Sequence, residues 1–76
     1  MLLSVDKKDS FGGLILESYR IEVPDHYWGN IPAISRLIKF RIGWSGLRAD
    51  VVDYGEGRFQ ISPVGVHEVA FIHLTA

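Results

Sequence analysis

Apolar and polar residues alternate along most of this chain, and this spacing limits the possible folds more than any other feature of the sequence. Because successive side chains of a β-strand point to opposite faces, the alternation is typical of strands with one buried face. Glycines and prolines separate the runs at roughly the 8- to 12-residue spacing of small β-proteins. We therefore predict a mainly β protein, a small antiparallel barrel or sandwich of about six strands.

The length of the chain sets its domain organisation. With 76 residues it is too short for two cores, so residues 1–76 are expected to form one compact domain. The chain has no cysteine, which excludes disulfides and thiolate metal sites. Because a core of this size supplies little stability, self-association is the remaining means of stabilising it. The first residues lack the apolar segment of a secretory signal, and no apolar run is long enough for a membrane-spanning helix. We therefore expect a cytoplasmic protein without membrane association.

The clearest alternation runs from Arg36 to Trp44 and predicts a strand. Ser45 and Gly46 then predict a two-residue hairpin turn, because glycine readily takes a positive φ. In that hairpin, Arg41 would lie opposite Asp50 on the polar side. This strand would be the first of a three-stranded antiparallel meander over residues 36–62. We call the apolar side of the meander, which would pack against the core, its dry face. The dry face consists of Ile38, Phe40, Ile42, Trp44, Leu47, Ala49, Val51, Phe59 and Ile61.

The second turn of this meander lies at Gly55–Gly57. We predict a three-residue loop with Gly57 in the left-handed conformation, because this length places Val51 opposite Ile61. A two-residue loop would shift the pairing by one and set an apolar residue against a polar one.

Three further strands complete the expected fold. They cover Leu2–Asp6, Leu14–Val23 and Val66–Leu74, and the last lacks alternation, which indicates a strand covered on both faces. As an alternative to the strand beginning at residue 36, a helix of about two turns could occupy residues 30–38, capped by Asn30. The fold would then be α+β.

The segment between Pro24 and Pro32 is the first candidate site. Two prolines stiffen such a loop, so its aromatic rings would be presented to a partner at a small entropic cost. Rigid tyrosine and tryptophan side chains are the residues that commonly anchor protein interfaces. In the alternative interpretation, Trp28 folds over an open end of the barrel as a lid, and one ring could cap the core while the other meets a partner. The predicted partner-binding loop consists of Asp25, His26, Tyr27 and Trp28.

A second candidate site is the outer face of the meander. Cations and an aromatic ring on a sheet face are the groups with which single-stranded nucleic-acid binders hold phosphates and stack bases. The alternative is a solvated face with cross-strand ion pairs. A formal net charge of −1 argues against nucleic acid for the molecule as a whole. The candidate residues are Lys39, Arg41, Arg48, Tyr54 and Arg58.

The sequence offers little for catalysis or metal binding. Asp25 and His26 come nearest to an acid–base pair, so a small enzyme centred on them is the second alternative function. His67 and His73 would share one face of a strand but lie about 20 Å apart, too far to bind one metal ion. We predict no catalytic residue, no metal site and no cofactor.

The resulting prediction is a small non-enzymatic interaction module that binds a protein partner and self-associates as a homodimer. It depends on the aromatic loop and on the apolar residues on both faces of Val66–Leu74, which would suit a shared sheet. The first alternative is a small β-barrel that binds single-stranded nucleic acid. A chain of this kind also fits an accessory protein of a mobile element or phage.

Overall fold

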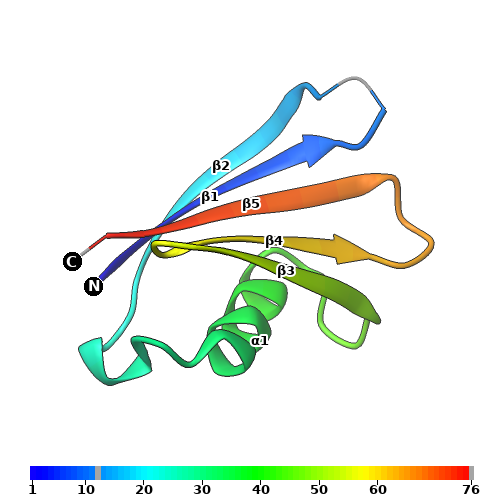
Figure 1. Cartoon of the computed structure of the whole chain (residues 1–76). Helices are drawn as coiled ribbons and strands as arrows, with labels where there is room; N and C mark the ends of the chain where they lie inside the picture. The colour runs from blue at the N-terminus through cyan, green and yellow to red at the C-terminus, as the bar shows by residue number, and fades with distance from the viewer. Residues whose placement is uncertain (12, 76) are drawn as a thin grey trace.

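A computed structural model describes residues 1–11 and 13–75 of the chain. These residues form one antiparallel sheet, one α-helix and a short 3-10 turn (Figure 1). The prediction of a mainly β protein is confirmed. The elements are β1 (Leu2–Asp9), β2 (Ile15–Glu22), η1 (Asp25–Tyr27), α1 (Ile31–Arg41), β3 (Ala49–Gly55), β4 (Arg58–Pro63) and β5 (Glu68–Thr75).

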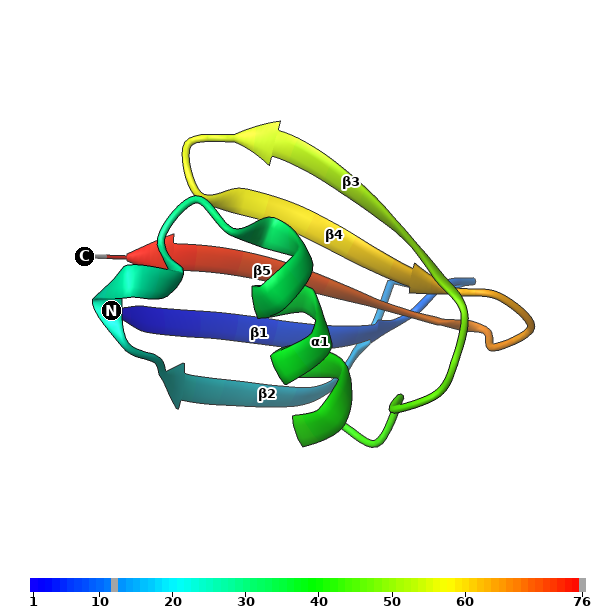
Figure 2. The same ribbon diagram turned by 90° about the horizontal axis from the view of Figure 1, so that it is seen from below.

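The sheet has five strands in the order β2-β1-β5-β4-β3, and all neighbours are antiparallel. β1 and β5 therefore lie side by side in the middle of the sheet, while β2 and β3 form its edges. Helix α1 connects these two edge strands and runs across one face of the sheet (Figure 2). The described residues thus form an open sheet with one helical layer, not the closed barrel or two-sheet sandwich that we expected.

Residues 31–41 form a helix, so the strand predicted from Arg36 is wrong and the alternative helix over residues 30–38 is confirmed. The residues at the start of the helix explain why this segment is helical. The Asn30 side chain caps it by accepting a hydrogen bond from the amide of Ala33 at 3.2 Å, and Pro32 lies in the first turn, where its missing N–H costs nothing. Because α1 replaces the strand, the Ser45–Gly46 hairpin and the Arg41–Asp50 pair do not form.

The buried face of α1 follows the helical period. Ile34 and Ile38 are fully buried and Ile42 nearly so, whereas Phe40 is 71% exposed. Residues four apart share a face of a helix, but residues two apart do not, so Phe40 turns away from the core. Phe40 is therefore wrongly assigned to the dry face. Val51 lies opposite the buried Ile61 and so points to the expected face, but it is 42% exposed because β3 is an edge strand.

The turn between β3 and β4 has the predicted register but a different construction. Val51 lies opposite Ile61 and Gly57 has a φ of +76°, as expected. However, Gly55 pairs with Arg58, so the turn contains only Glu56 and Gly57, and an irregularity after Asp53 supplies the extra residue. A bulge of this kind preserves the pairing of apolar residues while shortening the loop.

The core lies between α1 and one face of the sheet. Four side chains of the helical segment, Ile34, Ile38, Ile42 and Trp44, contact the sheet residues that point toward the helix. Each strand contributes alternate residues to this face, as period-two alternation requires. The buried sheet residues are Leu3, Val5, Ile21, Phe59, Ile61, Ala70, Ile72 and Leu74.

The opposite face of the sheet is not covered by any element in the described part of the chain, and we call it the open face (Figure 1). Phe71 and His73 of β5 belong to it, since they alternate with the buried Ala70 and Ile72. The missing alternation in β5 therefore marks a central strand with an aromatic residue on the open face, and not a second covering layer. Other residues of the open face are Ser4, Asp6, Lys8, Ser18, Tyr54, Arg58 and Gln60.

Candidate functional site

The loop between Pro24 and Asn30 has an ordered backbone. The amide of Tyr27 donates to the carbonyl of Pro24 at 3.1 Å, and the amide of Trp28 donates to the carbonyl of Asp25 at 3.0 Å. The amide of Asn30 then donates to the carbonyl of Tyr27 at 2.9 Å. These consecutive bonds link the backbone of the residues that carry the two aromatic rings.

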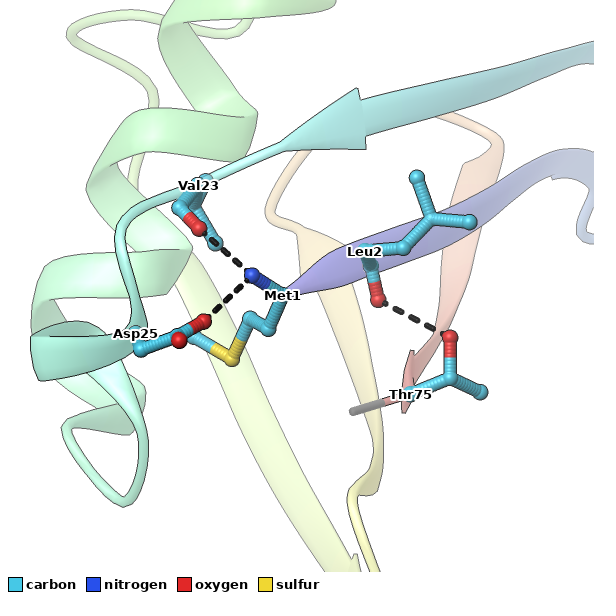
Figure 3. Close-up of polar contacts among 5 residues, drawn as sticks. All are labelled: Met1, Leu2, Val23, Asp25 and Thr75. Atoms are coloured by element: carbon cyan, nitrogen blue, oxygen red, sulfur yellow. Dashed lines mark hydrogen bonds and ion pairs between the residues drawn. The ribbon is translucent and has the colours of Figure 1, made fainter.

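Asp25 forms an ion pair within the fold. Its carboxylate lies 2.7 Å from the ammonium group of Met1, which also donates to the carbonyl of Val23 at 2.8 Å (Figure 3). The hydrogen bond from the ammonium group, together with its charge, lowers the pKa of Asp25. A lowered pKa makes a carboxylate a weaker base, so this geometry does not favour Asp25 as a general base paired with His26.

The two large aromatic residues of the loop have different environments. Tyr27 packs against the core, while Trp28 is 57% exposed. The ring of Trp28 lines a depression of about 170 Å³ beside the β3–β4 turn, together with Gly57 and Leu74. Tyr27 thus takes the capping role and Trp28 is presented outward, so the interpretation of Trp28 as a lid is wrong.

The five residues of the predicted nucleic-acid face lie in two separate layers. Lys39 and Arg41 are on helix α1, and Arg48 lies in the segment that leads to β3. Tyr54 and Arg58 lie on the open face of the sheet. The structure therefore brings together only the last two, because the strand that would have carried the others is a helix.

Tyr54 and Arg58 instead line a groove of about 500 Å³ on the open face. Cross-strand pairing builds this groove, since His73 of β5 lies between Arg58 of β4 and Ser4 of β1. The next row of the sheet places Phe71 between Gln60 and Asp6. The lining side chains of the open face are Ser4, Asp6, Tyr54, Arg58, Phe71 and His73.

Four of these lining residues were missed by the sequence analysis. Ser4 and Asp6 reach Phe71 and His73 only through the long-range pairing of β1 with β5. Local patterns do not specify which distant strands pair, so the alternation in each strand could not reveal the groove. The one available signal was Phe71, which interrupts the alternation of its strand.

Several polar groups of the open face are already paired. The hydroxyl of Ser18 donates to Asp6 Oδ1 at 2.8 Å, and the hydroxyl of Tyr54 donates to Gln60 Oε1 at 2.7 Å. Lys8 Nζ lies 4.9 Å from the centre of the Phe71 ring. Within residues 1–11 and 13–75, the guanidinium of Arg58 makes no ion pair. It therefore remains available to an anion.

A third surface is the end of the β1–β2 hairpin, which the sequence analysis did not identify as a site. Four large apolar side chains are strongly exposed there: Phe11 (77%), Leu14 (69%), Ile15 (57%) and Leu16 (48%). The Phe11 ring contacts His67 of the neighbouring β4–β5 connection, with ring centres 4.6 Å apart. The remaining three belong to β2 or lie just before it, at the edge of the sheet.

Charge is unevenly distributed along the chain. Residues 26–49 contain four of the eight Lys and Arg but none of the nine Asp and Glu. The four are Arg36, Lys39, Arg41 and Arg48, and all belong to the helix and the segment that follows it. The helix and the segment after it are thus basic, while seven of the nine acidic residues lie on the strands. Cations near the end of a helix also stabilise its dipole, so this distribution has a structural explanation.

In residues 1–11 and 13–75, no group of three or more His, Asp or Glu is placed to hold a metal ion. Helix α1, like η1, is too short to cross a bilayer, and the described residues include no longer helix.

No protein-family model matches the chain, and no curated protein or solved structure matches it significantly.

Proposed function

We propose that this chain is a small non-enzymatic interaction module that binds protein, and that its first partner is a second copy of itself. The observation that carries the proposal is the apolar end of the β1–β2 hairpin, where Phe11, Leu14, Ile15 and Leu16 are 48 to 77% exposed. Monomeric proteins rarely leave several large apolar side chains exposed together, and such patches usually mark interaction sites.

Burial of these side chains would supply the driving force for association. Each Å² of apolar surface removed from water contributes about 25 cal/mol, so four large side chains contribute several kcal/mol before the entropic cost of association. The same end of the molecule includes edge strand β2, which pairs with β1 on one side only in the described sheet. An unpaired strand edge can accept a strand from another molecule.

The loop that presents Trp28 is proposed as a second contact. Its backbone is fixed by consecutive hydrogen bonds, so little conformational entropy is lost when the ring is buried by a partner. Tryptophan is among the residues that contribute most to interface affinity. Asp25 and His26 would contribute polar contacts around it.

Sedimentation velocity over about 10 to 500 µM protein tests self-association, because the dimer fraction must rise with concentration. We expect the natural chain to dimerise and the double variant Leu14→Ser, Leu16→Ser to remain monomeric. The matched control is Val51→Ser, Val64→Ser, which removes two exposed apolar side chains elsewhere and should dimerise normally. A natural chain that stays strictly monomeric across this range would refute the homodimer.

Tryptophan fluorescence tests the loop separately. Trp44 is 4% exposed and Trp28 is 57% exposed, so acrylamide quenching reports mainly on Trp28. If the loop belongs to the dimer contact, quenching should weaken as protein concentration rises. Quenching that is independent of concentration in a dimerising protein would place Trp28 outside the self-contact.

A further inference from the structure

We propose that the groove on the open face binds a nucleotide, with the phosphate beside Arg58 and His73 and the base stacked on Phe71. The ligand is either a free nucleotide or one unit of a single-stranded nucleic acid, which share this chemistry. The site is distinct from the hairpin end and from the Trp28 loop, so the proposal does not depend on self-association.

The phosphate position is defined by one row of the sheet. Arg58 lies directly opposite His73, and His73 lies opposite Ser4 on its other side. Guanidinium N–H groups bind phosphate oxygens in a bidentate manner, and imidazole N–H and hydroxyl groups add single hydrogen bonds. The Arg58 guanidinium has no ion-pair partner among the described residues, so no internal contact must be broken first.

The base position is defined by the next row. Phe71 lies on the central strand β5, is 37% exposed and lines the groove. Side chains two residues apart on a strand are about 7 Å apart, a span that a base and its 5′-phosphate can bridge from Phe71 to His73. Open antiparallel sheets that bind single-stranded RNA use aromatic residues of their central strands in this manner.

Asp6 and Gln60 flank Phe71 on the neighbouring strands. Both polar atoms of the Gln60 side chain are hydrogen-bonded within the sheet, to Tyr54 and Ser62, so Asp6 is the residue that can contact the edge of the base. Oδ1 of Asp6 accepts a hydrogen bond from Ser18, which leaves its other oxygen for an exocyclic amino group. This arrangement favours bases with an amino group, such as adenine, over uracil or thymine.

Lys8 currently covers part of the stacking surface, with Nζ 4.9 Å from the centre of the Phe71 ring. An exposed cation–π contact is weaker than the stacking of a base on an aromatic ring. A base can therefore displace this flexible side chain. Lys8 itself lines the neighbouring depression on the other side of Phe71, and the acidic residue that lines the groove is Asp6.

Binding is measured with two probes, a fluorescein-labelled adenine hexanucleotide by anisotropy and adenosine 5′-monophosphate by amide chemical-shift titration. The test variants are Arg58→Ala and Phe71→Leu. Their matched controls are Arg36→Ala and Phe40→Leu, which remove the same groups from the exposed surface of α1. Circular dichroism verifies that all four variants are folded.

We expect Arg58→Ala and Phe71→Leu each to weaken binding about tenfold, and the controls to stay within about twofold of the natural chain. Equal affinity for the monophosphate and the hexanucleotide would identify a free nucleotide, and much tighter hexanucleotide binding would identify a single strand. Absence of binding by both probes would overturn the proposal. So would a loss of affinity in Arg36→Ala and Phe40→Leu with none in the groove variants, since the ligand would then lie on the helix.

Discussion

The amide of Leu74 donates a hydrogen bond to the carbonyl of Gly57 at 2.7 Å, and the two backbones are so close that a Cβ on Gly57 would lie 2.9 Å from the carbonyl oxygen of Leu74. The turn between β3 and β4 therefore packs directly against the final part of β5. Gly57 also has a φ of +76°, which other L-residues adopt only with strain. Two independent effects thus require glycine at this position.

The first prediction concerns this contact. Gly57→Ala should lower the free energy of unfolding by about 2 kcal/mol or more, and Gly57→Val by more still, because backbone strain and a steric clash add. Gly46→Ala is the control, since Gly46 has a φ of +83° but open space around its Cβ position. Urea unfolding should show a loss of only about 1 kcal/mol there. Equal losses of unfolding free energy at both positions would show that the close approach to Leu74 does not destabilise the Gly57 variants.

The second prediction separates helix from strand at residues 31–41. Ile38→Ala should destabilise the protein by about 2 to 5 kcal/mol, because Ile38 is fully buried. Phe40→Ala should change stability by less than about 0.5 kcal/mol, because Phe40 is 71% exposed. A strand would bury both residues on the same face. If Ile38→Ala does not fold, Ile38→Val, expected to cost about 1 kcal/mol, replaces it in the same urea titration.

The third prediction concerns the pH dependence of stability. The Met1 ammonium lowers the pKa of Asp25, whose ordinary value is 3.8. The folded state therefore binds a proton at Asp25 less readily than the unfolded state does, so stability from this pair is present above that ordinary value and is lost as pH falls through the lowered one. We expect Asp25→Asn to lose less stability than the natural chain between about pH 7 and pH 2.

The pKa of Glu17 is also lowered, so Glu17 too stabilises the folded state at neutral pH and loses this contribution as the pH falls. The Asp25→Asn variant should therefore retain part of the acid sensitivity. The hydrogen bond from the Tyr19 hydroxyl and the contact with Lys7 lower the pKa of Glu17. Glu56→Gln, which makes the same charge change in the exposed β3–β4 turn, is the control for the loss of one negative charge. An identical pH profile for Asp25→Asn and the natural chain would show that the Met1 contact does not stabilise the fold.

The fourth prediction concerns Ser35 on the buried face of α1. Its hydroxyl oxygen is buried without a hydrogen-bond partner among the described residues. Replacing it by alanine removes an unsatisfied polar atom and improves helix propensity, so Ser35→Ala should raise the free energy of unfolding by about 1 kcal/mol. Ser45→Ala, at an exposed position outside the helix, should leave the melting temperature unchanged. A destabilised Ser35→Ala would indicate that the hydroxyl has a partner in solution.

Local signals were sufficient for part of this fold. The glycines around Glu56 predicted the register of β3 against β4, because only one pairing matches Val51 with Ile61. Asn30 correctly predicted the start of a helix. The error at Ile38 and Ile42 has a simple cause, since residues spaced by four satisfy both a period of two and a helical period. The hydrogen bond that caps the helix at Asn30 and the exposure of Phe40 both identify the helical period as the correct one.

The groove on the open face could not be predicted because its residues meet through pairing between distant strands. Arg58 and Tyr54 were identified as a basic and an aromatic residue on one face, and the structure keeps them together. Asp6 and Phe71 become neighbours only when β1 pairs with β5. Nothing in either segment specifies this partner, because the alternation of β1 would suit any strand with an apolar face.

The central position of β5 has a consequence for how the chain reaches its native state. In the described sheet, β5 is the strand that joins the β1–β2 hairpin to the β3–β4 hairpin. Each hairpin pairs segments that are close in sequence, but the β1–β5 pairing must close a loop that includes everything between them, and such closure slows folding. During synthesis, both hairpins leave the ribosome before β5. The two hairpins therefore become hydrogen-bonded into one sheet only after β5, which is made after both of them, has inserted between β1 and β4.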